Sequence, residues 1–264
     1  MKTLLFLSGL PRSGSTLLGS ILSQHPEIHV TPTSPLSDLL CLIDEDFLQV
    51  DQNYTYDKQN IVKNTYTSLL NNFYNHIDKP YVMDKHRAWP KNVPPLKLFL
   101  NHSPKIIATN RRVSEILSSY ILLIEKNNSN NFIDQHLRLE GKQINLDNRV
   151  ECLWRDYVSD PYQSLVIGLR HFRENIHLID YNDLTENPEE ELNKIYGFLE
   201  IEPHKHNFES ILNTCAEEKD YAWGLENLHT IRPKLQRTSP PPEEVIGEEN
   251  VKLYDLFNIK DEKN

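Results

Sequence analysis

The chain has 264 residues, of which 38% are hydrophobic and 25% are charged, and its formal net charge is −10. These fractions are typical of a globular protein and exclude extended disorder and collagen-like or coiled-coil architectures. Because neutralising nucleic-acid phosphates requires an exposed basic face, we expect no nucleic-acid partner for so acidic a chain. An anionic ligand must be held by a local cluster of basic groups and backbone amides.

Three cysteines, Cys41, Cys152 and Cys215, lie far apart in the sequence. Their spacing fits neither a disulfide framework nor a set of metal ligands, which indicates a reducing compartment. The apolar run at residues 4–7 is too short for a signal peptide and ends at Ser8-Gly9, so it predicts a buried strand. No later stretch could cross a bilayer, and we therefore expect a cytoplasmic protein without a membrane span.

The elements follow from apolar patterning along the chain. Short apolar runs predict buried strands at residues 3–7, 80–84, 106–108 and 176–180. Helical spacing predicts helices at residues 15–23, 57–77, 113–124, 150–172 (interrupted at Pro161), 188–199 and 251–257. The stretch 31–37, rich in Pro, Ser and Thr, predicts a loop. Strands that alternate with helices favour an α/β fold with three layers around a central parallel sheet. No repeat or linker divides the chain, so we expect a single domain over residues 1–264.

The most informative segment is Gly9-Leu10-Pro11-Arg12-Ser13-Gly14-Ser15-Thr16, between the first strand and its helix. A turn there directs several backbone N–H groups and the start of the helix at one point, a geometry that binds phosphate or sulfate. The spacing matches the nucleotide-binding pattern G-x-x-x-x-G-K-[ST], except that Ser15 stands in place of the lysine. The positive charge lies instead at Arg12, inside the turn.

The run from Pro11 to Thr16 resembles the sulfotransferase loop P-[KR]-[SAT]-G-[ST]-[ST], which binds the 5′-phosphosulfate of 3′-phosphoadenylyl sulfate (PAPS). The continuation to His25-Pro26 resembles the bacterial and protein-tyrosine branches of that family. This resemblance implies a P-loop NTPase-like sulfotransferase fold, PAPS as co-substrate, 3′,5′-adenosine bisphosphate (PAP) as product, and no metal. Within the loop it assigns donor binding to Arg12, Ser13, Gly14, Ser15 and Thr16.

A second resemblance lies at the third predicted strand, where Lys105-Ile106-Ile107-Ala108-Thr109-Asn110-Arg111 is followed eight residues later by Ser119. In sulfotransferases an arginine at the strand end and a serine on the next helix bind the 3′-phosphate. A guanidinium can hold a phosphate through two hydrogen bonds, and a hydroxyl adds a neutral donor. The resemblance therefore assigns the 3′-phosphate to Arg111 and Ser119, with the neighbouring Arg112 as the alternative to Arg111.

Two further resemblances concern the second half of the chain. The stretch from Tyr181 to Pro188 resembles Y-E-D-L-x-x-x-P near the adenine site, which implies that Tyr181 borders the base. The stretch from His229 to Lys234 resembles a basic element that closes over the donor in some members. It implies donor contacts from Arg232 and Lys234 and a closing tail over residues 230–264. A solvated tail is the alternative.

The candidate catalytic residues lie in Met83-Asp84-Lys85-His86-Arg87, where the second predicted strand ends. Strand carboxyl ends face the ligand crevice in open parallel sheets. By resemblance, Lys85 contacts the bridging oxygen or sulfuryl group, and Arg12 holds the leaving 5′-phosphate. His86 is the first candidate for the general base, because an imidazole accepts a proton near neutral pH. Asp84 is the second candidate.

The acceptor is not identified by the sequence: a small molecule, a glycan or a lipid each fits, and the oligomeric state stays open. The protein-tyrosine branch uses a glutamate after its H-P element, whereas residues 30–34 contain no carboxylate, which argues against a tyrosyl peptide. Acceptor loops are expected at residues 31–51 and 127–146, since such loops vary independently of the core. Two other functions remain open. One is a magnesium-dependent P-loop kinase of small molecules, and the other is a nucleotide-binding protein without catalysis.

Overall fold

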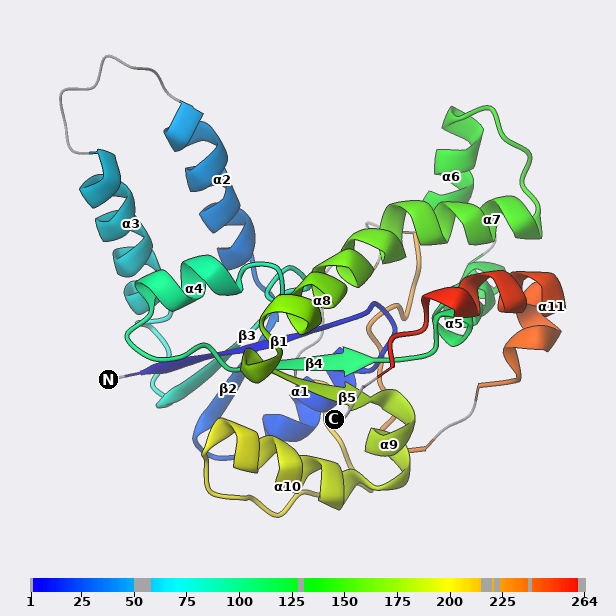
Figure 1. Cartoon of the computed structure of the whole chain (residues 1–264). Coiled ribbons are helices and arrows are strands. Elements are labelled where there is room, and N and C mark those ends of the chain that lie inside the picture. Colours follow the sequence, from blue (N-terminus) through cyan, green and yellow to red (C-terminus); the bar gives the residue numbers. More distant parts are fainter. Residues whose placement is uncertain are drawn as a thin grey trace.

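The structure is a computed structural model that describes residues 2–49, 58–127, 131–214, 220, 224–236 and 239–260. Within these residues, five parallel strands form one central sheet (Figure 1). The strands are β1 (Thr3–Gly9), β2 (Ile28–Thr33), β3 (Tyr81–Lys85), β4 (Ile106–Asn110) and β5 (Ile176–Asp180). Their order is β2-β3-β1-β4-β5, and each neighbouring pair is parallel. The predicted α/β class, the parallel sheet and four of its strands are confirmed.

The edge strand β2 is a correction to the sequence analysis. The loop predicted at residues 31–37 is wrong over residues 31–33, which continue this strand. Pro32 cannot donate a ladder hydrogen bond, but an edge strand tolerates proline. The pairing with β3 accordingly shifts register between Val30 and Thr33.

Helices α1 (Ser15–Leu22), α9 (Tyr181–Glu186) and α10 (Pro188–Leu199) cover one face of the sheet (Figure 1). Their apolar side chains form one core with strand residues of that face: Leu5, Leu7, Met83 and Ile107 from the sheet, with Leu18, Ile21, Leu184, Ile195 and Leu199 from the helices. This packing holds the start of α1, and with it the preceding loop, against the sheet.

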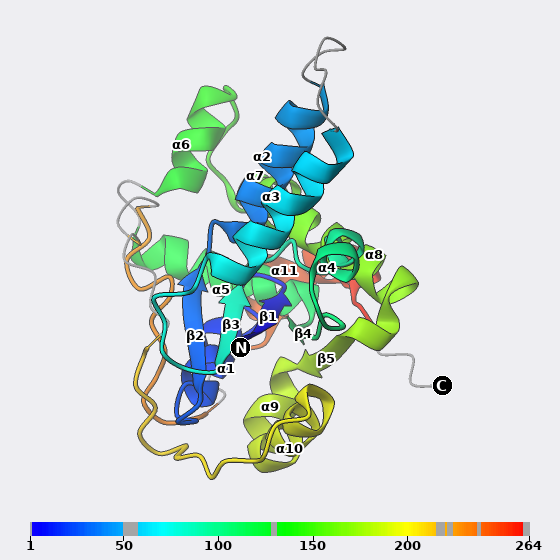
Figure 2. The ribbon, with the colours of Figure 1, turned by 90° about the vertical axis from the view of Figure 1, so that its left-hand side faces the viewer.

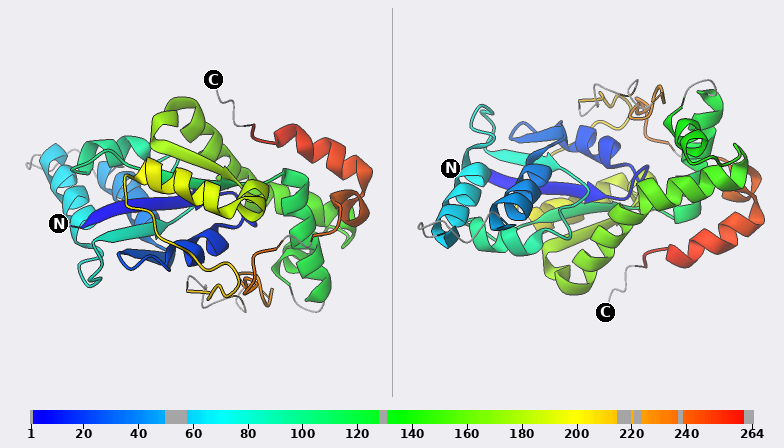
Figure 3. Two further views of the ribbon diagram at one scale, coloured as in Figure 1. Left: turned by 90° about the horizontal axis from the view of Figure 1, so that it is seen from below. Right: turned by 90° about the horizontal axis from the view of Figure 1, so that it is seen from above.

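The opposite face carries a larger helical layer, seen from two sides in Figure 3. It includes α4 (Val93–Phe99), α5 (Val113–Lys126), α7 (Leu146–Leu153), α8 (Ser159–His171) and α11 (Pro242–Tyr254). Its core contains Leu4, Phe6, Val82, Ile106 and Ala108 from the sheet, with Trp89, Ile116, Leu165 and Tyr254 from the other layer. Helices α2 (Leu36–Gln49) and α3 (Lys58–Asn72) project side by side from one end, and α6 (Phe132–Leu139) projects separately (Figures 1 and 2).

Several helices differ from the expected pattern. Helices α2, α4, α6 and α9 were not predicted, and the acceptor loops expected at 31–51 and 127–146 contain α2 and α6. Contrary to the prediction, the helix is not interrupted at Pro161, because Pro161 lies within α8. The irregularity lies just before it, where a π-helical segment (Trp154–Val158) joins α7 to α8. The helix expected at residues 251–257 begins earlier, at Pro242, and ends in a 3₁₀ turn (Asp255–Phe257). Residues 50, 51, 128–130 and Cys215 lie outside the described residues, while Cys41 and Cys152 form no disulfide.

The chain after α10 returns along the β2 side of the sheet as an extended segment (Figure 2). Two backbone hydrogen bonds join residues 208–211 to residues 233–235. The Ile211 N–H donates to the Pro233 carbonyl at 2.7 Å, and the Leu235 N–H donates to the Phe208 carbonyl at 3.0 Å. The returning part thereby reaches the edge where the strands end. In the part of the chain that the structure describes, no helix is long and apolar enough to cross a membrane.

Candidate active site

A cavity of about 750 Å³ lies at the carboxyl edge of the sheet. Its walls are the ends of β1 and β3, the starts of α1 and α9, one face of α5, and residues 224–236, which we call the cover segment. The lysines and arginines that line it are Arg12, Lys85, Arg87, Arg111, Lys126, Arg232 and Lys234. Glu226 is the one acidic residue among its described lining residues. A chain of net charge −10 thus concentrates positive charge at one site.

The loop between β1 and α1 depends on two glycines. Gly9 has φ 134° and Gly14 has φ 90°, and Arg12 between them also has a left-handed φ of 58°. A Cβ atom would lie 2.3 Å from the Thr109 carbonyl oxygen at Gly9, and 2.7 Å from the Tyr181 ring at Gly14. Only glycine fits where the β4 backbone and the Tyr181 ring approach so closely.

Ser13 supports this loop from behind. Its hydroxyl is fully buried, donates to the Leu10 carbonyl at 2.5 Å and lies 2.6 Å from Thr109 Oγ1. No described group accepts a hydrogen bond from the backbone N–H groups of residues 13–16, which stand at the start of α1. The N–H groups at a helix start attract anions, so this end of the cavity can bind a phosphate or sulfate.

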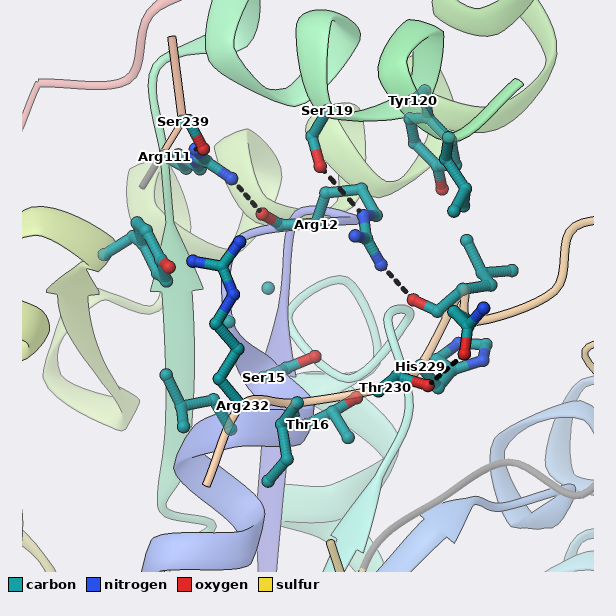
Figure 4. Close-up of a pocket in the computed structure, with 18 of the residues that line it drawn as sticks. Arg12, Ser15, Thr16, Arg111, Ser119, Tyr120, His229, Thr230, Arg232 and Ser239 are labelled. Carbon is teal, nitrogen blue, oxygen red and sulfur yellow. Dashed lines mark hydrogen bonds between the residues drawn. The ribbon is translucent and has the colours of Figure 1, made fainter. Parts of the chain in front are cut away.

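The side chain of Arg12 leaves the loop and lies between α5 and the cover segment (Figure 4). Its Nε donates to Ser119 Oγ at 3.1 Å, and an NH group donates to the Leu228 carbonyl oxygen. Burial lowers the pKa of this guanidinium, and the positive charge of Arg111 lowers it further. An anion bound here would restore the lost solvation of the guanidinium.

Arg111, at the end of β4, is held on several sides. It pairs with Glu115 at 2.9 Å, and both side chains are only 5% exposed. It donates to the Arg12 carbonyl at 3.0 Å and to Ser239 Oγ at 3.2 Å. Its guanidinium lies 4.5 Å from the centre of the Tyr181 ring, a cation–π geometry. These contacts place Arg111, Arg12 and Tyr181 together.

The cover segment supplies two further cations, of which one extends into the cavity and the other forms an ion pair. Arg232 is exposed and extends into the cavity toward Arg111 in Figure 4. Lys234 forms an exposed ion pair with Glu209 at 2.6 Å. Arg232 is therefore the better placed of the two to meet an anion.

The cover segment is fastened to the rest of the protein at its other end. Asn127, the cap of α5, donates to the Glu226 carbonyl at 3.3 Å and accepts from the Glu226 N–H at 3.0 Å. Asn213 donates to the His229 carbonyl at 3.0 Å, and the His229 N–H donates to Asp220 at 3.0 Å. Helix α5 and the cover segment thus enclose the cavity together.

Lys85, the last residue of β3, faces residues 9–16 at the junction of β1 and α1, which we call the anion loop. Its Nζ donates to Thr16 Oγ1 at 3.1 Å, and its side chain is almost fully buried. The strand pairing with β1 aligns Lys85 with Leu7. A buried ammonium beside the start of α1 can neutralise charge on a group held by the loop.

His86, the next residue, lies just past the strand end and also lines the cavity. Its Nδ1 accepts from the Ala88 N–H at 3.2 Å, and its Nε2 lies 3.3 Å from an Asp38 carboxylate oxygen. Burial lowers the pKa of His86, while the charge of Asp38 opposes that shift. The neutral ring consequently carries its proton on Nε2, toward Asp38.

Asp84, the second candidate base, points to the other side of β3. Its oxygens accept from Tyr74 Oη and from Trp89 Nε1, the latter at 2.8 Å, and it is fully buried. Burial raises the pKa of this carboxyl. Successive residues on a strand face opposite sides, so Lys85 faces the cavity and Asp84 does not. Among the site residues predicted from sequence, all line the cavity except Asp84 and Ser13.

Three residues of interest were not predicted: Asp38, Arg87 and Lys126. Asp38 lies in the first turn of α2, in a segment expected to be a loop. Arg87 directly follows the catalytic candidates, and Lys126 ends the predicted helix that begins at Val113. Helical spacing from Ser119 would have placed Lys126 on the same side of α5, two turns further on.

A parallel sheet of this order, with an anion loop after its first strand and cations around it, defines an α/β protein built to bind an anionic ligand. The family model described as the sulfotransferase family matches residues 5–205. The chain therefore belongs to the sulfotransferase family. No curated protein sequence matches the chain.

Solved structures share the fold. The sulfotransferase domain from the curacin biosynthetic pathway has a TM-score of 0.51 at 17% identity, covering 98% of this chain and 92% of that chain. The sulfotransferase domain of the Synechococcus PCC 7002 olefin synthase has a TM-score of 0.51 at 16% identity, with coverages of 96% and 94%. Mouse sulfotransferase SULT7A1, complexed with PAP, has a TM-score of 0.55 at 14% identity, with coverages of 98% and 85%. At these identities the likeness extends to the fold.

Proposed function

We propose that this sulfotransferase moves a sulfuryl group from PAPS to a hydroxyl or amine of an acceptor. The observation that carries the proposal is that Arg12 contacts both Ser119 and Arg111, beside backbone N–H groups of the anion loop that have no described acceptor. A donor with a phosphosulfate at one end of the ribose and a phosphate at the other needs two neighbouring anion sites. The complex of mouse SULT7A1 with PAP supports the same donor class.

The residues present fit such a donor. The amides of residues 13–16 and Arg12 suit the 5′-phosphosulfate, because they combine a helix start with a guanidinium. Ser119, Arg111 and Arg232 suit the 3′-phosphate, and the ring of Tyr181 suits the adenine. PAPS supplies an activated sulfuryl group on a phosphate leaving group, and the chain aligns it and stabilises the developing charge.

The end of β3 supplies the remaining chemistry. Lys85 lies beside Thr16 at the start of α1, where its ammonium stabilises negative charge that develops on the bridging oxygen. We assign removal of the acceptor proton to Nδ1 of His86, the ring nitrogen that carries no proton, which gives up its hydrogen bond from the Ala88 N–H as it takes the proton. Asp38 then stabilises the imidazolium at Nε2. Asp84 is not assigned a role, since both its oxygens are engaged in the core.

The kinase alternative is not favoured. A P-loop kinase uses the lysine that Ser15 replaces here, and its family is not the one that this chain matches. We also propose that the chain acts as one domain in which residues 230–236 close the cavity. Helix α11, further along the chain, belongs to the helical layer, since it packs on α5.

Two measurements test the proposal together. In a thermal-shift titration without magnesium, PAP should stabilise the protein, by about 2.7 kcal/mol at one hundred times its dissociation constant. Mg-ATP at the same concentration should stabilise it far less. Transfer of label from ³⁵S-PAPS to a panel of phenols, alcohols and amines should then be observed. Equal stabilisation by Mg-ATP would refute the donor assignment, and PAP binding without transfer to any acceptor would indicate a protein that has lost catalysis.

A further inference from the structure

Two cations in the cavity are not accounted for by the donor. Arg87 and Lys126 both line it, and in the described part of the chain neither forms an ion pair or a side-chain hydrogen bond. The other cations have partners or a proposed role: Arg111 pairs with Glu115, and Lys234 pairs with Glu209. Both side chains are exposed, and a cation at the mouth of a cavity attracts an anionic ligand.

These two cations lie away from the cluster assigned to the donor phosphates. Lys126 is seven residues beyond Ser119 on α5, which corresponds to about 10 Å along the helix axis. Arg87 follows His86, and its carbonyl accepts from Ser8 at 3.2 Å and from Ser164 at 3.0 Å, which fixes its backbone. Arg87 therefore belongs to the His86 end of the cavity, and Lys126 lines the cavity from α5, beyond the serine assigned to the donor.

The cavity wall beside Lys126 is largely apolar. Helix α5 presents Tyr120, Leu122 and Leu123 to the cavity on the stretch that leads to Lys126. Two carboxylates are nearby. Asp38 is turned to His86 and is not among the described lining residues, and Glu226 lines the cavity from the cover segment. Among the described residues, Glu226 forms no ion pair with Lys126 or Arg87.

We propose that Arg87 and Lys126 form an acceptor subsite, and that the acceptor is a hydroxyl compound with an apolar body and an anionic group. This inference rests on the proposed sulfotransferase function and names its substrate class. The hydroxyl lies at His86, the apolar body lies along α5, and the anionic group meets the two cations. The net charge of −10 repels anions, so an anionic acceptor needs local cations to offset this repulsion.

The experiment uses three phenols that differ at the far end: 3-(4-hydroxyphenyl)propanoate, its methyl ester, and tyramine. Their para-alkyl phenol groups are alike, whereas the far groups are anionic, neutral and cationic. Binding to the PAP complex is measured by calorimetry, and transfer from PAPS is measured separately. We expect the propanoate to bind at least about tenfold more tightly than its ester, as a charge-assisted hydrogen bond implies. 4-Hydroxybenzylphosphonate shows whether carboxylate or phosphonate is preferred.

Variants locate the effect. Arg87→Gln and Lys126→Gln should each reduce the ratio of propanoate to ester affinity, and Arg87→Glu should shift the preference toward tyramine. Lys63→Gln removes an exposed charge on α3, away from the cavity, and should leave the ratio unchanged. Because the readout is a ratio within one variant, a general loss of stability does not imitate it.

Binding and transfer separate the two proposals. If all three phenols bind equally to the PAP complex, or if Arg87→Gln leaves the ratio unchanged, the anionic subsite is refuted. If the propanoate binds preferentially through Arg87 and Lys126 but no acceptor is sulfonated, the subsite stands and the catalytic proposal fails. Preferential binding of tyramine would refute the subsite directly.

Discussion

The Asp38 carboxylate, on α2, lies 3.3 Å from Nε2 of His86 at the end of β3. The opposite ring nitrogen accepts the Ala88 N–H, so the imidazole is held from both sides in a fixed orientation. Asp38 is 67% exposed while the His86 side chain is 15% exposed, so the pair spans from solvent to cavity. A carboxylate at this position stabilises the positive charge that His86 acquires when it takes up a proton.

The first prediction concerns this pair. His86→Ala should lower turnover by roughly 10²–10⁴-fold if the imidazole takes part in proton removal. Asp38→Asn should lower turnover in the same direction, because the amide cannot stabilise the imidazolium. Both losses should shrink with 4-nitrophenol, whose hydroxyl is already acidic. Normal turnover in His86→Ala, together with loss of turnover in Asp84→Asn, would move the base to Asp84.

The second prediction is the pH dependence of kcat/KM. Burial lowers the pKa of His86, so the neutral, proton-accepting form persists below the usual histidine value of about 6.5. Activity should therefore fall only as the pH drops below that value. The charge of Asp38 raises the pKa of His86, so Asp38→Asn should move this limb to still lower pH. A limb that does not move in Asp38→Asn would show that the titrating group is not His86.

The third prediction separates binding from chemistry at Lys85. Lys85→Met keeps most of the side-chain volume and removes the ammonium that donates to Thr16. Since its charge serves the transition state, turnover should fall by about 10²-fold or more while PAP affinity stays close to that of the wild type. Matched kinetic and calorimetric titrations check this. A parallel loss of PAP affinity would show that Lys85 binds the donor in its ground state.

The fourth prediction concerns the 3′-phosphate. Arg111 and Glu115 are a buried ion pair, so removing Arg111 alone would strand a charge and cost about 3–5 kcal/mol of stability. The informative variant is Arg111→Met with Glu115→Gln, compared with the wild type, because neither protein then holds a buried charge without its partner. PAP binding should weaken by about 1.5–3 kcal/mol, whereas binding of adenosine 5′-phosphate should hardly change. An equal loss for both ligands would place Arg111 outside the 3′-phosphate site.

The parts of the site that local patterns predict are those formed within one segment. The apolar run before Gly9 predicted β1, and the spacing of Gly9, Arg12 and Gly14 predicted the anion loop. Contacts between distant segments are different: Arg12 meets Leu228 across 216 positions of the chain, and no local spacing encodes such a contact. The contact between Asp38 and His86 was missed for the same reason, because only the position of α2 in the fold brings Asp38 to His86.

The fifth prediction concerns stability in acid. Burial lowers the pKa of His206 to about 4, and its Nε2 lies 2.8 Å from Tyr196 Oη. Between this value and the unfolded value of about 6.5, the unfolded chain binds the extra proton, so stability falls as the pH falls. In urea titrations at pH 7 and pH 5, His206→Gln should lose less stability than the wild type. The exposed His171→Gln is the control, and identical losses in all three proteins would contradict the assignment.

The hydrogen bond from Arg12 to the Leu228 carbonyl has a kinetic consequence. The guanidinium proposed to receive the donor's phosphosulfate is also a fastening point of the cover segment. Entry of the donor is then an exchange of one acceptor for another, and its observed rate should level off at high donor concentration, at the rate with which the fastening opens. The same exchange runs backward after transfer. As PAP leaves, the Leu228 carbonyl should regain Arg12, so the fastening should weaken retention of the product.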